Sequence, residues 1–274
     1  MNSLFQQFQT QSAKKWEEKI KEDLKGKDYY SLIGNDGISP FYHADIVNQN
    51  QPITKENSWN TCQLIDASNA KDANRKALLA LKNDVSTLCF SNPNNLEVLL
   101  KDISIEQIRI DFKNYTPNFV NEWRDFIGDK TVNGAFHGNE DFSHPNYCGT
   151  TIFAKGDTAK EQIKDAFEKG KKEKGNIQFH FFIGQQYFIE IAKLRAFRIL
   201  WKEKTGNESF IFAEISTKNQ QKDNAYNNLI SSTTACMSAI FGGADSILVN
   251  SYNEKKPSSD FSERLIRNQQ NILR

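Results

Sequence analysis

The feature that most limits the fold of this chain is a regular alternation of short apolar segments with longer amphipathic ones, which begins at Trp59 and continues to the C-terminus. The apolar segments have the length and composition of buried strands, and the amphipathic ones have the 3.6-residue period of helices. We expect strands at 59–66, 85–90, 107–112, 132–137, 149–154, 177–184, 210–216 and 246–252. We expect helices at 70–83, 96–101, 117–127, 158–172, 187–203, 225–241 and 261–273, with loop-like sequence after the fourth strand.

Strands that alternate with helices are parallel and carry the helices on their outer faces. Eight parallel strands close into a barrel without leaving a pore. The sequence therefore predicts an α/β fold, a (β/α)8 TIM barrel over residues 59–274. An open, doubly wound sheet is the alternative, because counting strands does not prove closure.

Residues 1–58 differ from the rest and form an N-terminal extension of one helix and a turn-rich loop segment. Trp16, Ile20 and Leu24 recur at four-residue spacing on an otherwise very charged helix, and Tyr29 follows them. A stripe this narrow is too small for an independent core. We expect these residues to pack either along the barrel or along a partner chain.

Composition excludes several function classes. The net charge is +1, which gives no field that would attract nucleic acid or an anionic membrane. No apolar run is long enough to span a bilayer and the N-terminus has no signal-peptide pattern, so we expect a cytoplasmic protein. The four cysteines are widely separated, which indicates free, mostly buried thiols.

In a barrel, function collects at the C-terminal ends of the strands. Asp66, Asp111, His137 and Glu214 stand at such ends, where converging carboxylates and a histidine would serve as acid and base. The alternative is that each of them caps a helix or binds loop amides. We predict no metal site, because no HxH or HxxxH pair occurs. No nucleotide-binding glycine motif and no GxSxG elbow occurs either.

Several stretches carry a family likeness. The run FFIGQQYFIEIAKLRAFRILW resembles the methylmalonyl-CoA mutase family, as do AYNNLISSTTACMSAIFGGADSILVNSYNE and SSDFSERLIRNQQNIL. Near the start, WEEKIKEDLKGKDYYSLIGNDGISPFYHADI is similar to the opening of the family's small, non-catalytic chains. The matches cover most of the chain in the right order.

The departures from the family pattern bear on function. Catalytic chains carry a GYH segment whose Tyr and His face the substrate and cobalamin, and Thr150 and Thr151 stand at these positions here. The family's cobalamin domain, with its DxHxxG motif, has no counterpart. The resemblance therefore implies a small subunit, non-catalytic and binding no cofactor by itself, in a heterodimer whose large subunit carries catalysis with adenosylcobalamin. It also implies that Trp16, Ile20, Leu24 and Tyr29 pack against that partner.

Two other functions stay open at this point. One is a self-sufficient barrel enzyme that uses Asp66, Asp111, His137 and Glu214. The other is a barrel module that binds an acyl-CoA along its axis, which requires small polar side chains there.

Overall fold

The computed structural model describes residues 9–28, 42–43, 45, 58–221, 223–253 and 259–274. The chain divides into two compact units, Met1–Pro52 and Ile53–Arg274. In the first, helix α1 (Ala13–Asp23) begins at Ser12, whose hydroxyl accepts a hydrogen bond from the Lys15 amide. Trp16 and Ile20 are half-buried along one side of α1, and Leu24 is half-buried at its C-cap. Tyr29 lies outside the described residues.

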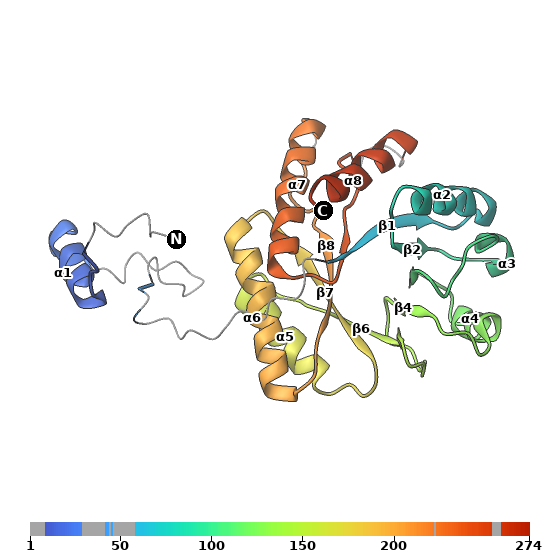
Figure 1. The fold of residues 1–274 in the computed structure, drawn as a ribbon, viewed down its shortest axis with the longest axis horizontal. Helices are drawn as coiled ribbons and strands as arrows, with labels where there is room; N and C mark the ends of the chain where they lie inside the picture. Colours follow the sequence, from blue (N-terminus) through green and yellow to red (C-terminus); the bar gives the residue numbers. More distant parts are fainter. Residues whose placement is uncertain (1–8, 29–41, 44, 46–57, 222, 254–258) are drawn as a thin grey trace. The chain divides into compact units, whose positions relative to one another are not determined.

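The second unit is built on a parallel sheet of nine strands in the order β5-β4-β3-β2-β1-β9-β8-β7-β6. Figure 1 shows the helices of this unit around the sheet. Its strands are β1 (Asn60–Asp66), β2 (Thr87–Ser91), β3 (Arg109–Lys113), β4 (Asn133–Phe136), β5 (Tyr147–Cys148), β6 (Thr150–Phe153), β7 (Ile177–Ile183), β8 (Phe210–Ile215) and β9 (Ser246–Leu248). Its helices are α2 (Ala70–Lys82), α3 (Leu96–Leu99), α4 (Phe119–Ile127), α5 (Ala159–Gly170), α6 (Tyr187–Thr205), α7 (Ala225–Gly242) and α8 (Asp260–Ile272). No described helix is both long enough and apolar enough to cross a membrane.

The sheet curls into a nearly closed barrel, which differs from the expected closed eight-stranded one. The short strand β5 pairs with β4 inside a segment that we expected to be a loop, and no described ladder joins β5 to β6. Across this seam the Thr151 amide donates to the Gly138 carbonyl at 2.8 Å, and the Thr151 hydroxyl donates to the Phe136 carbonyl at 2.6 Å. Gly149 permits the close approach of its own backbone to residue 140, since a Cβ at position 149 would lie 2.6 Å from the Glu140 carbonyl oxygen.

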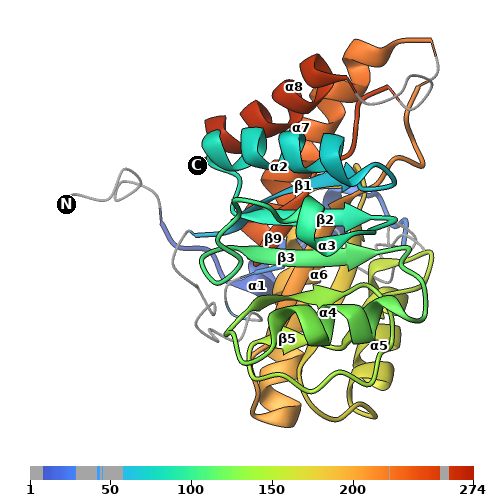
Figure 2. The ribbon, with the colours of Figure 1, turned by 90° about the vertical axis from the view of Figure 1, so that its right-hand side faces the viewer.

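Each strand has an outer face that packs under helices and an inner face that lines the barrel. The outer residues form two apolar clusters. One includes Leu88, Phe112 and Trp123 and lies under α2, α3 and α4; Figure 2 looks onto this side. The other includes Phe179, Phe197 and Ile247 and lies under α5, α6 and α7.

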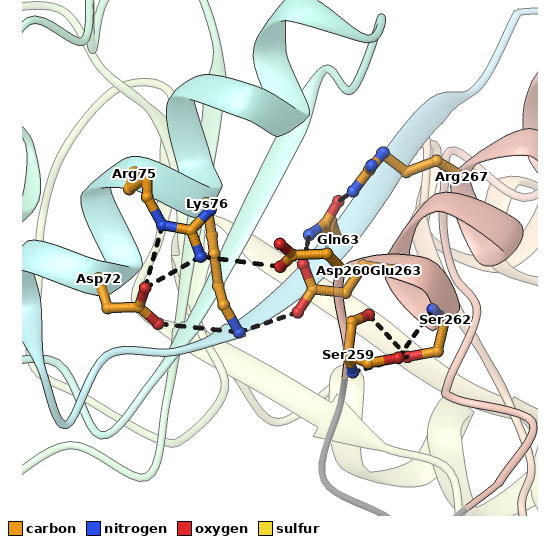
Figure 3. A network of polar contacts seen from close by, with 9 residues as sticks. All are labelled: Gln63, Asp72, Arg75, Lys76, Ser259, Asp260, Ser262, Glu263 and Arg267. Atoms are coloured by element: carbon orange, nitrogen blue, oxygen red, sulfur yellow. Dashed lines mark hydrogen bonds and ion pairs between the residues drawn. The ribbon is translucent and has the colours of Figure 1, made fainter.

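The last helix, α8, is joined to the first strand–helix unit by a polar network (Figure 3). Arg267 donates to the Gln63 amide oxygen at 2.9 Å, and the Gln63 amide nitrogen donates to Glu263 at 3.3 Å. Lys76 of α2 forms an ion pair of 3.0 Å with Glu263. Ser259 and Ser262 form a reciprocal cap at the start of α8. The two sequence ends of the barrel are therefore held together by buried polar contacts as well as by the pairing of β1 with β9.

Candidate functional site: the polar interior of the barrel

Four polar side chains meet inside the barrel: Asp111 of β3, His137 directly after β4, His180 of β7 and Glu214 of β8. His137 Nε2 lies 3.2 Å from Asp111 Oδ2, and the Nδ1 atoms of the two histidines are 3.3 Å apart. His180 Nε2 lies 3.1 Å from Glu214 Oε2. These four residues, named here the carboxylate–histidine chain, cross the interior from one side of the barrel to the other.

A basic residue accompanies each carboxylate. The Lys113 ammonium lies 2.6 Å from Glu214 Oε2, and Arg109 Nε lies 3.0 Å from Asp111 Oδ1. Arg109 also donates to the amide oxygen of Gln178 at 2.7 Å. Two negative and two positive side chains therefore balance inside the barrel, as buried charges require.

Burial sets the protonation of the histidines. It lowers the pKa of His137 to about 4, against the opposing effect of Asp111, and it also lowers the pKa of His180. Burial would raise the pKa of Asp111, but the Arg109 charge and the His137 hydrogen bond outweigh it and hold that pKa below its usual value. Glu214 behaves alike: burial opposes ionisation, yet the His180 hydrogen bond and the Lys113 charge keep its pKa low. Near neutral pH the chain thus holds two carboxylates and two neutral imidazoles.

Two neutral imidazoles have two N–H donors for three contacts. Gln178 offers a further donor, since its amide nitrogen lies 3.4 Å from His137 Nε2 and donates to the Thr151 hydroxyl at 2.8 Å. With the proton of each ring on Nε2, His137 donates to Asp111 and His180 donates to Glu214, and the contact between the two Nδ1 atoms then carries no proton.

Aromatic rings fill the space around the carboxylate–histidine chain. The Phe212 ring centroid lies 4.6 Å from that of His137 and 5.0 Å from that of His180, and the Phe153 ring stacks on His180 at 4.7 Å. The side chains of Asp111, His137 and His180 are at most 1% exposed, and that of Glu214 is 13% exposed. A catalytic group must touch its substrate, and this packing leaves the interior closed to one.

Asp66, the fourth residue of the expected acid–base set, lies apart from the other three. It accepts hydrogen bonds from the amide and hydroxyl of Ser68 and from the side chain of Asn92, and the Asn92 bond is the main reason its pKa is lowered. The structure therefore brings together Asp111, His137 and Glu214 and assigns Asp66 to loop capping.

Thr150 and Thr151 are engaged at the barrel seam. The Thr150 hydroxyl donates to the side chain of Asn139 at 2.9 Å, and the Thr151 hydroxyl bridges the Phe136 carbonyl and Gln178. Both side chains are occupied by structural hydrogen bonds. Neither offers a group of the acid–base strength of Tyr or His.

Near the C-terminal ends of β7 and β8 the surface holds a cavity of about 20 Å³, lined in part by Gln185, Ser231 and Asn250. That volume suits a water molecule rather than a substrate. Among the described residues, no group of three or more His, Cys, Asp or Glu side chains is arranged to hold a metal ion. Cys62, Cys89 and Cys236 are buried free thiols and Cys148 is half-buried.

The sequence analysis named none of Arg109, Lys113, Gln178 and His180 as site residues. The sequence signal that could have found them is polar residues at every second position of a strand. Arg109, Asp111 and Lys113 alternate with apolar residues along β3, as Gln178 and His180 do along β7. Residues two apart in a strand share a face. Polar residues on a shared face of buried strands indicate a polar interior.

Comparison with known proteins identifies the relatives of this chain. Residues 162–274, from α5 to the C-terminus, match the family profile described as methylmalonyl-CoA mutase. These residues belong to the methylmalonyl-CoA mutase family. The resemblance predicted from the sequence motifs is confirmed.

Among curated proteins, the methylmalonyl-CoA mutase small subunit of Porphyromonas gingivalis is 26% identical over 99% of this chain and 58% of its own length. The methylmalonyl-CoA mutases of Rhizobium meliloti and Escherichia coli are 34% and 32% identical over 42% and 41% of this chain, which is 18% of each relative. The chain thus spans little more than half of the small subunit, and a much smaller part of each mutase. Among solved structures, a dihydropteroate synthetase covers 78% of the chain with 8% identity and a TM-score of 0.39.

The residues that carry the mutase-family motif fasten helices to the barrel. Lys193 of α6 donates to the Phe182 carbonyl and to the Gln162 side chain. Arg198 donates to the carbonyls of Ser209 and Gly243 and to Asp245, and is itself buried. In this chain the motif has a structural function, because its cations satisfy buried carbonyls at the edges of β7 and β8.

Proposed function

We propose that this chain is the small, non-catalytic subunit of a heterodimeric, cobalamin-dependent methylmalonyl-CoA mutase, an isomerase whose chemistry is carried by a larger partner chain. The observation that carries the proposal is the alignment of 99% of the chain with a small subunit, together with a barrel interior packed with rings and ion pairs. Its cytoplasmic location remains a prediction.

The packed interior of the barrel favours a non-catalytic role for this chain. Phe212 and Phe153 pack against the two interior histidines, and Arg109 lies over the Phe210 ring at 4.1 Å. A threaded acyl-CoA needs an open bore lined by small polar groups. The packing therefore argues against the acyl-CoA-binding module that we considered from the sequence.

The residues of this chain do not fit adenosylcobalamin. Thr150 and Thr151 are both hydrogen-bonded across the seam, and His137 and His180 are turned toward carboxylates and each other. No step of the mutase reaction is therefore assigned to this chain. In the proposed complex the cofactor belongs to the partner.

The self-sufficient enzyme is the second candidate, because Asp111, His137 and Glu214 do converge. Their side chains are at most 13% exposed, which argues against it, and Asp66 binds its own loop instead. For the N-terminal unit, we propose that Trp16, Ile20, Leu24 and Tyr29 pack against the partner chain, a role for which the half-exposed stripe on α1 is suited.

The decisive experiment measures cobalamin binding and mutase activity for the purified chain, alone and with the large mutase chain of its source organism. We expect no stoichiometric cobalamin and no turnover of methylmalonyl-CoA by the chain alone, and activity when the large chain is present. Tight one-to-one cobalamin binding by the 274-residue chain would overturn the proposal. Activity of the chain alone, lost on His137→Ala, would favour the self-sufficient enzyme.

A further inference from the structure

Helix α7 has an outward face that is unusual for the outer ring of an α/β barrel. None of its 18 residues, all within the described part of the chain, is charged. Its outer positions follow helical spacing and include three large exposed side chains: Tyr226 is 73% exposed, Ile230 67% and Phe241 46%. Thr234 and the half-buried Met237 lie between them. The helix also carries polar side chains, such as the exposed Asn227, but large apolar side chains grouped on one outward face indicate a surface that a partner covers.

Helix α6 lies next to α7 and continues the apolar surface (Figure 1). Phe188 is 79% exposed, and Ala192 and Ala196 follow it on the outer side at four-residue intervals. Between Phe188 and Lys202, the exposed charge on this side is Arg195, whose Nε donates to the Phe241 carbonyl at 2.8 Å and so joins the two helices. The residues Phe188, Ala192, Ala196, Tyr226, Ile230, Thr234, Met237 and Phe241 are named here the α6–α7 face.

The other outer helices do not share this property. Helix α5 alternates charges along its outer side, for example Lys160, Lys164 and Glu168, and it has the capping box of a solvated helix. Helix α2 exposes Leu79 at 37%, but among Lys71, Asp72 and Arg75. Helix α8 exposes Phe261 at 53% and Ile272 at 83%, but Arg264 lies over the Phe261 ring, and the two residues are at opposite ends of the helix. Among the described helices, neighbouring exposed apolar side chains are therefore most extensive on α6 and α7.

The size of the α6–α7 face fits a stable protein interface. Its four large side chains expose on the order of 500 Å² together, since each aromatic ring has about 200 Å² of accessible surface. The small residues around them bring the total toward the roughly 800 Å² that each partner contributes to a standard interface. A patch of this size is at the upper end of the roughly 300–600 Å² that the largest apolar patch of a monomer covers, and such patches are often functional.

We infer that the α6–α7 face is the docking surface for the large mutase chain, which places its own counterparts of α6 and α7 against it about a pseudo-two-fold axis. This rests on the proposed function. Charge and sequence both favour that occupant. The family profile covers residues 162–274, which contain both helices, so a mutase-family partner has the equivalent pair. The eight side chains of the α6–α7 face are uncharged, and the exposed Arg195 beside them donates to the Phe241 carbonyl, so a similar surface can meet this face without burying an unpaired carboxylate.

The test is the affinity between the 274-residue chain and the large mutase chain of its source organism, measured by sedimentation or calorimetry with matched variants. Ile230→Glu and Phe188→Glu each place a carboxylate on the α6–α7 face, and we expect each to weaken binding about 100-fold or more. Leu79→Glu on α2 is the control, and we expect it to change the affinity less than twofold. The exposed positions and unchanged thermal unfolding establish that the variants are folded.

Three results would contradict the inference. If the large chain binds the unmodified chain but also both α6–α7 variants with equal affinity, the docking surface is elsewhere and the proposed function still stands. If the large chain does not bind the unmodified chain at all, the proposed function fails as well. If the chain alone forms a dimer that Ile230→Glu dissociates, the occupant is a second copy of this chain instead.

Discussion

At the scale of single residues, the interior shows how this barrel tolerates buried charge. Lys113 and Glu214 form a nearly buried ion pair of 2.6 Å, and Asn250 donates to the other oxygen of Glu214 at 3.0 Å. Buried pairs add little net stability over apolar packing, but they become costly when one partner is lost. The charges of the two carboxylates in the carboxylate–histidine chain are thus stabilised by Arg109 and Lys113 rather than by water.

The buried histidines predict a stability that falls on the acid side of neutrality. The pKa of His137 is lowered to about 4 in the folded chain, while an unfolded histidine titrates near 6.5. Between these values the unfolded state binds more protons, so the free energy of unfolding rises with pH and falls as the solution is acidified from pH 6.5 to 4. We expect a loss on the order of 2 to 3 kcal/mol, measured by urea denaturation across that range.

His137→Gln supplies the comparison, because glutamine does not titrate and still reaches Asp111. We expect this variant to lose part of the dependence on pH in that window. The remainder belongs to His180 and, toward pH 4, to carboxyls with lowered pKa values such as Asp111 and Glu214. His144→Gln in the loop before β5 is the matched control and should retain the full dependence. An unchanged slope in His137→Gln would show that this histidine is accessible to protons in the folded chain.

The sequence pattern alone predicts only some of the residues that line the barrel interior. The alternating pattern of β3 (RIDFK) predicts which residues share a face of the strand, but it does not predict which of the two faces lines the barrel interior. Gln63 of β1 illustrates the difficulty: it is polar and buried, yet it points outward to Arg267 of α8. Asp66 illustrates the converse, because its position at a strand end is as expected while its side chain binds its own loop.

At the scale of elements, α6 and α7 approach each other closely through one small residue. A Cβ on Gly242 would lie 2.9 Å from Leu194 Cδ1 and 3.0 Å from Leu194 Cβ. The second distance involves an atom fixed to the α6 backbone, so a rotamer change at Leu194 does not relieve it. The spacing of these helices therefore depends on the absence of a side chain at position 242.

Gly242→Ala should separate the helices and lower the free energy of unfolding by about 1 to 2 kcal/mol, despite the better helix propensity of alanine. Combining it with Leu194→Ala should cost less than the sum of the two single changes, which a double-mutant cycle measures. Thr234→Ala on the exposed side of α7 is the control and should lie within about 0.5 kcal/mol of the original. Strict additivity would contradict the contact.

The elements themselves follow closely from the sequence. The strands and helices expected from periodicity are found, most with ends displaced by one or two residues. Strand β5 was missed because two residues are too few to show a periodic pattern. Strand β9 ends four residues earlier than expected. Beyond its end, the Asn250 side chain donates to the Ile215 carbonyl and the Tyr252 carbonyl accepts from Asn228. Closure of the barrel depends on hydrogen bonds across the seam, which no local pattern encodes.

At the scale of the whole molecule, the two compact units predict that residues 53–274 form a folding unit of their own. We expect this fragment to unfold in one cooperative transition, at a midpoint within a few degrees of the full chain, because its polar network already joins α8 to β1 and α2. Calorimetry of both chains measures this. A fragment that lacks cooperative unfolding would show that residues 1–52 complete the core.

The filled interior has a consequence for regulation. A ligand shifts a conformational equilibrium only when it binds two states with different affinity. Rings and ion pairs pack the interior of the barrel, so we expect an acyl-CoA to bind no state of this chain preferentially and to leave its outer surface unchanged. Within the proposed complex, this chain would act as a constitutive scaffold, and any substrate-dependent change in assembly would originate in the partner.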